Sequence, residues 1–124
     1  MIDCGKVKSL AEDWIRAWNS HDLEAVMSHY SEDIVFYSPF VVKLAGAPSG
    51  ALRGKVSLRE YFSKAFQAYP DLSFEWGRLF FGTQSFVLEY QSVLGRRASE
   101  LFILGDDDKI REVRAHYADD QAAS

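Results

Sequence analysis

The sequence predicts an α+β domain, because helix patterns occupy its first part and strand patterns most of the rest. In the first helix pattern, apolar residues recur at spacings of three and four and so share one face: Val7, Leu10, Trp14 and Trp18. From Leu72 onward, short alternating runs are separated by turn residues, as in an antiparallel meander. A chain of 124 residues is long enough for one hydrophobic core and too short for two, so we expect one domain over 1–124.

A second helix is expected directly after the first, from Leu23 to Tyr30. Asp22 stands where an N-cap side chain accepts a backbone hydrogen bond, and the apolar residues that follow share one face. The polar run 31–33 should end this helix. Residues 34–38 then alternate as a half-buried strand.

The segment after residue 56 predicts a third helix. Ser57 and Glu60 have the S-x-x-E spacing of a capping box, which satisfies two backbone N–H groups of a first helical turn. The apolar face of this helix would hold Leu58, Tyr61, Phe62, Ala65 and Phe66. The longer strands expected after it are 72–81, 85–94, 97–104 and 110–117.

A long connection, FVVKLAGAPSGALR, lies between Pro39 and Gly54. It is apolar at both ends and rich in Gly, Ala and Pro in the middle. Such a segment could be a lid over a pocket or a cover for a neighbouring subunit. It could equally be a surface crossover that packs its own valines.

Composition and charge restrict the class of protein. Aromatic residues make up 15% of the chain, an excess that favours an apolar ligand pocket, a large core or a dimer interface. The net charge is −4 and the basic residues are scattered, which argues against nucleic acid as a partner. The pair Arg96-Arg97 is interpreted as a solvated turn.

The N-terminal segment and the cysteine content also exclude several classes. Cys4 is the only cysteine, so neither an internal disulfide nor a cysteine-based metal site is expected. The first residues lack the apolar core of a signal peptide, and no later segment is suited to span a membrane. We therefore expect a cytoplasmic protein with no membrane partner.

Three stretches of the chain resemble the nuclear transport factor 2-like superfamily, and within it the SnoaL-like and ketosteroid-isomerase-like proteins. They are WIRAWNSHDLEAVMSHYSEDIVFYSP (14–39), ALRGKVSLREYFSKAFQAYPDLSFE (51–75) and KIREVRAHYAD (109–119). The resemblance implies a cystatin-like fold, in which a cone-shaped, curved, mixed or antiparallel sheet wraps around three N-terminal helices. It also implies one deep apolar pocket.

Three positions match the active site of the isomerases. Trp14 falls where that family has an oxyanion-binding tyrosine, and Ser38 where it has its aspartate base. Glu100 falls on the second acid, which an apolar site keeps protonated in the isomerases. Because serine is no base without a helper, we do not expect ordinary ketosteroid isomerisation.

Two other branches of the superfamily fit less well. The Asp-Arg-Asp set of limonene epoxide hydrolase would fall on Ser92, Tyr90 and Ala115. Scytalone dehydratase uses paired histidines, whereas this chain has three separate ones, at His21, His29 and His116. Histidines at these spacings also predict no metal site, and we expect no cofactor.

Glu100 is the candidate on which a catalytic role depends. It alternates with Ala98, Phe102 and Leu104, so its carboxyl shares an otherwise apolar strand face. If this face lines the pocket, burial should raise the pKa of Glu100 and make it a general acid or hydrogen-bond donor. If instead the face of Leu101 is the buried one, Glu100 lies at the surface.

The other candidate residues are a polar and an aromatic set. Ser38 would supply a positioning hydroxyl. His116 is ambiguous, because Ile110 and Val113 imply opposite faces for the last strand. For each large aromatic residue, packing in the core is as good an interpretation as binding a ligand. The expected pocket residues are Trp14, Trp18, Phe36, Tyr61, Phe62, Tyr90 and His116.

Two functions follow from these residues. The first is a cofactor-independent isomerase, cyclase or hydrolase type of enzyme that acts on a small apolar or cyclic substrate through Glu100 and Ser38. The second is a non-catalytic ligand-binding or dimerisation module of the same fold. In both cases we expect a homodimer formed through the sheet, because the run 101–104 is apolar on both faces.

Overall fold

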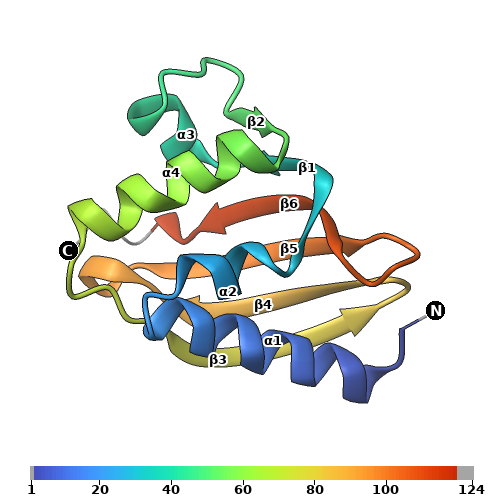
Figure 1. The fold of residues 1–124 in the computed structure, drawn as a ribbon. Coiled ribbons are helices and arrows are strands. Elements are labelled where there is room, and N and C mark those ends of the chain that lie inside the picture. The colour runs from blue at the N-terminus through green and yellow to red at the C-terminus, as the bar shows by residue number, and fades with distance from the viewer. Residues whose placement is uncertain (1, 120–124) are drawn as a thin grey trace.

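Residues 2–119 are described by a computed structural model of the chain (Figure 1). A 3₁₀ turn at Val93–Gly95 separates the fourth and fifth strands. The helices and strands in chain order are α1 (Cys4–Asn19), α2 (Leu23–Met27), β1 (Tyr30–Tyr37), α3 (Pro39–Leu44), β2 (Ala51–Arg53), α4 (Lys55–Ala68), β3 (Glu75–Gly82), β4 (Ser85–Gln91), β5 (Arg97–Leu104) and β6 (Ile110–Tyr117).

The six strands form one curved, mixed sheet in the order β2-β1-β6-β5-β4-β3. Only the β1–β6 pair is parallel, and the other neighbours are antiparallel. Helices α1, α2 and α4 lie against one face of this sheet, whereas α3 and the short β2 lie at its β1 edge (Figure 1). The predicted α+β class with a curved sheet around N-terminal helices is confirmed.

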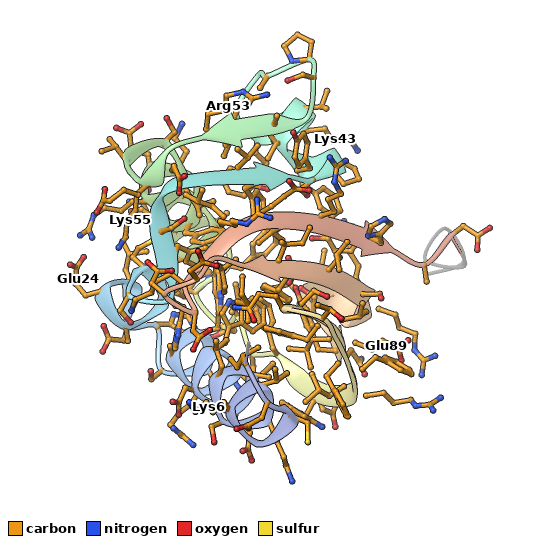
Figure 2. All side chains as sticks on the ribbon, turned by 90° about the vertical axis from the view of Figure 1, so that its right-hand side faces the viewer. Lys6, Glu24, Lys43, Arg53, Lys55 and Glu89 are labelled. Carbon is orange, nitrogen blue, oxygen red and sulfur yellow. The ribbon has the colours of Figure 1, made fainter. Side chains whose placement is uncertain are left out.

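Alternation along the central strands separates a core face from an outer face. On β5, Ala98, Glu100, Phe102 and Leu104 are buried under the helices, while the residues between them are partly exposed. β4 follows the same pattern, and its Glu89 extends from the face that the helices leave open (Figure 2). The even-numbered residues of these two strands therefore build the floor beneath the helices.

The second helix is shorter than predicted. Asp22 caps it as expected by accepting a hydrogen bond from the Ala25 N–H, but α2 ends at Met27. Tyr30 instead begins β1, where it pairs with Ile110 of β6. The polar run 31–33 was wrongly interpreted as a break: these residues lie within β1, at a register shift between Tyr30 and Val35.

The third predicted helix, α4, begins without a capping box. It starts at Lys55, directly after Gly54, whose φ of 90° lies in the region that favours glycine. No side chain caps this end, so the capping role predicted for Ser57 and Glu60 is wrong. Both of these side chains are exposed within the first turns of the helix.

The connection between Pro39 and Gly54 is partly ordered into α3. Ser38 caps α3 by accepting a hydrogen bond from the Phe40 N–H, and Pro39 occupies the first helical position, where a missing N–H costs nothing. Val41 is fully buried, whereas Val42 and Leu44 are exposed. The segment thus packs one of its valines into the core, and Phe40 and Leu44 of the same helix line the cavity described below.

The last strand contains a bulge that explains its two conflicting faces. Ile103 pairs with Glu112 but Leu104 pairs with Ile110, so one extra residue of β6 fits between these pairs. Both Ile110 and Val113 therefore face the core. Beyond the bulge the alternation is regular, and it places Ala115 inside and His116 outside.

The meander is close to the prediction, with shifts at its ends. β5 and β6 have the predicted bounds, but β3 begins at Glu75 and β4 ends at Gln91. Leu72 and Phe74 are buried although they precede β3. Within residues 2–119, no helix has the length and apolarity that crossing a bilayer requires.

Candidate active site

A cavity of about 100 Å³ lies between the helices and the floor of the sheet. Its walls come from α1, α4, α3, the core faces of β1, β4, β5 and β6, and the turn after β4. The more exposed wall residues belong to α3, the end of α4 and the 92–96 turn, so the mouth opens there. The wall consists of Trp14, Trp18, Phe36, Phe40, Leu44, Tyr61, Phe62, Ala65, Tyr69, Leu72, Phe74, Tyr90, Ser92, Val93, Arg96, Glu100 and Tyr117.

Glu100 lies in this wall, and only 3% of its surface is exposed. Tyr90 is on the neighbouring strand β4, and its hydroxyl donates a hydrogen bond of 2.6 Å to Oε2 of Glu100. Leu88 is the direct cross-strand partner of Glu100, and Ala115 flanks it on β6, so apolar groups surround the carboxyl on both sides. Among the described residues, only Oε2 has a hydrogen-bond donor, which leaves Oε1 for a ligand.

Burial raises the pKa of Glu100 to about 7, because the charged carboxylate loses its solvation by water. The Tyr90 hydrogen bond acts in the opposite direction, since it stabilises the carboxylate, but it is the smaller effect. A carboxyl with this pKa is present in both protonation states near neutral pH. It can therefore either give or take a proton.

Tyrosines surround this carboxyl. Burial, followed by the negative charge of Glu100, raises the pKa of Tyr30, Tyr90 and Tyr117. Burial also raises the pKa of Tyr61 to about 12, and a hydrogen bond with Ser38 offsets part of this rise. These phenols stay protonated at neutral pH, so they can act as hydrogen-bond donors around the cavity.

Ser38 is buried, but it is not part of the cavity wall. Its hydroxyl accepts the Phe40 N–H at 3.2 Å and also interacts with the phenols of Tyr61 and Tyr117. Ser38 thus holds the start of α3. It lies behind the wall and orients Tyr61 and Tyr117, which belong to the wall. The structure does not bring it into direct contact with the cavity.

The two tryptophans of α1 line the cavity, but neither bonds to Glu100. Trp14 donates its indole N–H to the Tyr30 hydroxyl at 2.9 Å. Trp18 Nε1 is the buried side-chain polar atom of the described chain that lacks a hydrogen-bond partner. Its ring packs edge-on against Phe62, with centroids 4.7 Å apart. A ligand oxygen placed against this N–H would satisfy it.

Of the other predicted pocket residues, four line the cavity and one lies outside it. Phe36, Tyr61, Phe62 and Tyr90 all belong to the wall. His116 does not: it is exposed on the opposite face of the sheet, where its Nδ1 lies 3.0 Å from the Arg114 carbonyl. The expectation that His116 binds in the pocket is corrected, because the β6 bulge turns it outward.

Sequence reasoning missed several residues at the mouth, among them Phe40, Arg96 and Tyr117. The Arg96 guanidinium lies 4.6 Å from the centroid of the Phe40 ring, and the Tyr117 ring packs edge-on against the same phenylalanine at 4.7 Å. The signal for Tyr117 was present, because it continues the alternation of Val113 and Ala115. Arg96 gave no such signal, since a basic pair in a hairpin is commonly solvated.

Acid–base chemistry is what these side chains can supply directly. The wall offers one titratable carboxyl, several phenols and one guanidinium. Within residues 2–119, no three His, Cys, Asp or Glu side chains are grouped closely enough to hold a metal ion.

Known structures share this architecture. One, a SnoaL-like protein of unknown function from Burkholderia thailandensis E264, has 40% sequence identity and a TM-score of 0.91 over 94% of this chain and 98% of that one. An NTF2-like protein of unknown function from Cytophaga hutchinsonii ATCC 33406 has 16% identity and a TM-score of 0.72 over 94% of each chain.

A third structure belongs to an enzyme. SalBIII, described as an epoxide hydrolase/cyclase-like enzyme with a role in pyran ring formation in the polyether salinomycin, has 22% identity and a TM-score of 0.74. The similarity covers 96% of this chain and 95% of SalBIII, and at this identity it shows a shared fold. No curated protein matches the chain.

The family follows from the sequence match and from the fold together. The model of the SnoaL-like domain matches residues 11–113, from the middle of α1 to the middle of β6. This range includes Trp14, Trp18, Tyr90 and Glu100 of the cavity wall. The chain therefore belongs to the SnoaL-like domain family.

Proposed function

We propose that this protein is a cofactor-independent acid–base enzyme that acts on a small apolar or cyclic substrate, with Glu100 as the group that transfers the proton. The observation that carries the proposal is a carboxyl with a pKa of about 7, buried in an aromatic cavity and held by Tyr90. A catalytic acid or base works best when its pKa lies near the pH at which it operates. Carboxyls with strongly perturbed pKa values are concentrated at functional sites.

The reaction class follows from having one carboxyl in the wall. In its ionised form, Glu100 removes a proton from a C–H or O–H group, and the electron pair stays on the substrate. The resulting carboxylic acid returns this proton at another atom, which completes an isomerisation or a ring closure without consuming a co-reactant. The phenols of the wall would donate hydrogen bonds to an oxygen on which negative charge develops.

The fold similarity to SalBIII supports this class of reaction. SalBIII, an epoxide hydrolase/cyclase-like enzyme with a role in pyran ring formation, has the same fold, which agrees with the proposed ring-forming or isomerising reaction. The volume of about 100 Å³ is below the range of about 300–1,000 Å³ that drug-sized ligands need. We therefore propose a small substrate of one or two rings and not a steroid skeleton.

A non-catalytic ligand-binding module is the second candidate, and the packing of the aromatic rings favours it. Trp14 stacks on Phe74 with centroids 5.6 Å apart and meets Phe102 edge-on at 5.3 Å. Rings that contact each other this closely stabilise a core whether or not a substrate binds. Under this alternative Glu100 would bind a ligand as a hydrogen-bond donor and transfer no proton.

We further propose that the protein forms a homodimer through the outer face of its sheet. Phe80, Val87 and Leu101 are cross-strand neighbours on this face, and Ile103 lies beside them. Phe80 keeps 43% of its surface exposed. An apolar row of this kind in the middle of a sheet is suited to packing against a second sheet.

The test of catalysis uses a probe that needs only a base. In 5-nitrobenzisoxazole, removal of the ring C–H proton breaks the N–O bond and releases a coloured cyanonitrophenolate. We expect the protein to accelerate this reaction with a pH dependence centred near 7. Glu100→Gln should lower the rate by at least about 100-fold, because the amide cannot accept the proton.

Glu89→Gln is the matched control, since Glu89 lies on the same sheet but on the face away from the helices (Figure 2). This variant should retain the full rate. If the wild type and Glu100→Gln react at the same rate, the catalytic role of Glu100 is refuted and the binding-module alternative is favoured.

A further inference from the structure

Arg96 is a cation in the cavity wall whose role the acid–base proposal does not use. It is half-buried at the mouth, where its guanidinium carbon lies 4.6 Å from the centroid of the Phe40 ring. Apart from Glu100, it is the charged residue of the wall. Arg96 directly precedes β5 and Glu100 lies on it, but Arg96 is half-buried at the mouth whereas Glu100 is buried.

A tight turn fixes the position of Arg96. Its N–H donates to the Val93 carbonyl at 3.1 Å, and its own carbonyl accepts the Ser92 N–H at 2.6 Å. Leu94 and Gly95 complete the turn with φ angles of 58° and 72°. This geometry brings the side chain back over the mouth, where Figure 1 shows the β4–β5 connection beside the end of α4.

No carboxylate within residues 2–119 forms an ion pair with Arg96, although ion pairs occur elsewhere on the surface. The charge of Arg96 is also not among the causes that shift the pKa of Glu100, which are burial and the Tyr90 hydrogen bond. Arg96 does affect Tyr117: its positive charge lowers the pKa of this phenol, although burial raises that pKa by more. Among residues 2–119, the guanidinium therefore has no anionic partner, and it presents its N–H donors at the mouth.

We propose that Arg96 forms an anion subsite at the mouth of the cavity, so that the ligand is a small one-ring carboxylic acid with its carboxylate on Arg96 and its ring in the aromatic cavity. This inference rests on the proposed small-molecule function of the cavity and names the class of that molecule. A guanidinium binds a carboxylate through two parallel hydrogen bonds, which fix the orientation of the ligand. The contact with the Phe40 ring would hold the Arg96 guanidinium in place before the ligand binds.

The shape of the cavity agrees with such a ligand. A cavity of about 150 Å³ binds benzene, and the space here is about 100 Å³, so one ring would fill it and the rest of the ligand would extend into the mouth. The ring of the acid would contact Trp14, Trp18 and Phe62, while its carboxylate stays at the half-exposed mouth and avoids the cost of full burial. The atoms of the ring would then lie beside Glu100, where the proposed proton transfer takes place.

The experiment compares acids with their neutral amides as probes. Benzoate and benzamide, and cyclohexanecarboxylate and its amide, have nearly the same shape but differ in charge. Binding is followed by calorimetry and by the fluorescence of Trp14 and Trp18, which line the cavity. We expect at least one acid to bind at least about tenfold more tightly than its amide, with a preference that weakens as salt is added.

Variants assign this preference to one side chain. Arg96→Gln should remove the preference for the acid and leave amide binding unchanged, whereas Arg96→Lys should keep part of it. Arg97→Gln is the control with the same change in net charge, because Arg97 lies on the opposite face and not in the cavity wall. It should keep the full preference.

The outcomes separate this inference from the proposed function. If neither acid binds, or if each binds no better than its amide, the anion subsite is refuted. It is also refuted if Arg96→Gln keeps the preference. In those cases the proposed function stands or fails separately, on the Glu100-dependent reaction of 5-nitrobenzisoxazole, which carries no carboxylate.

Discussion

Burial changes the acidity of the Glu100 carboxyl. Apolar groups and one phenol surround it, so its charged form is favoured less than in water and its pKa rises to about 7. The folded protein therefore holds this proton more tightly than the unfolded chain, where the value is 4.5. The contribution of Glu100 to stability is therefore fully present below pH 4.5 and is lost as the pH rises through about 7.

Glu100→Gln should remove this dependence. Between pH 4.5 and pH 8, the wild type should lose up to about 3 kcal/mol of unfolding free energy relative to the variant, since each pKa unit corresponds to about 1.4 kcal/mol. Denaturant titrations at a series of pH values measure this difference. Parallel stability curves for the two proteins would show that Glu100 ionises normally.

Tyr90→Phe should raise the pKa of Glu100 further. The phenylalanine fills the same space, but it removes the hydrogen bond that stabilises the carboxylate. The midpoint of the pH–rate profile for 5-nitrobenzisoxazole should therefore shift upward. Tyr61→Phe, which removes a phenol that does not bond to Glu100, should leave the midpoint close to that of the wild type.

Single residues differed in how well the sequence predicted them. For Glu100, alternation predicted a strand face shared with Ala98 and Phe102 but left open whether that face was buried, which the helices packed on it decide. His116 could not, because the two faces implied by Ile110 and Val113 were the sign of a bulge, and a bulge is decided by pairing with β5. Arg96 was missed because its position depends on a turn and on a contact with the distant Phe40.

At the scale of elements, local patterns predicted types better than boundaries. α1 and β5 follow from periodicity, because burial of one face determines both the pattern and the structure. The bounds of β6 were also predicted, although its bulge breaks the alternation. The end of α2 depends on tertiary pairing, because Tyr30 pairs with Ile110 of β6 and so belongs to β1. The start of α4 depends on Gly54, whose backbone conformation begins the helix without a side-chain cap. The short α3 depends on the core that receives Val41.

Gly77 in β3 is an element-scale feature with a direct test. A Cβ at this position would lie 2.4 Å from the Glu89 carbonyl oxygen, inside a register shift between Trp76 and Leu79. This shift sets how β3 approaches the β4 segment that carries Tyr90. Gly77→Ala should therefore cost about 2 kcal/mol or more and perturb ligand binding.

Gly82→Ala is the control for this prediction. Its Cβ would meet the flexible Ser85 side chain at 3.1 Å, which can move aside. Thermal unfolding of the two variants measures the difference. Equal stability of both would show that the close approach of β3 and β4 at Gly77 is not required.

At the scale of the whole molecule, the two faces of the sheet serve different purposes. The inner face, with the helices, encloses the cavity, whereas the outer face leaves Phe80 exposed and its apolar neighbours Val87 and Leu101 half-buried. If this face packs against a second copy, the protein should sediment with twice its mass of 14.1 kDa. A stable interface of this kind needs about 800 Å² from each partner.

Leu101→Glu should convert the dimer to a monomer while leaving the cavity intact, because Leu101 points away from the helices. Val56→Glu, which changes an exposed apolar residue on α4, is the control and should remain dimeric. Sedimentation velocity at micromolar concentration distinguishes the two. A wild type that sediments as a monomer would refute the interface.

The titration of Glu100 itself tests the central claim most directly. Carbon-13 labelling of glutamate side chains makes each carboxyl visible by NMR, and the spectrum of Glu100→Gln identifies the signal of Glu100. The proposed acid–base function predicts a midpoint near pH 7 for this carboxyl. A midpoint near 4.5, the ordinary value, would show that Glu100 is solvated and would contradict its role as the proton-transfer group.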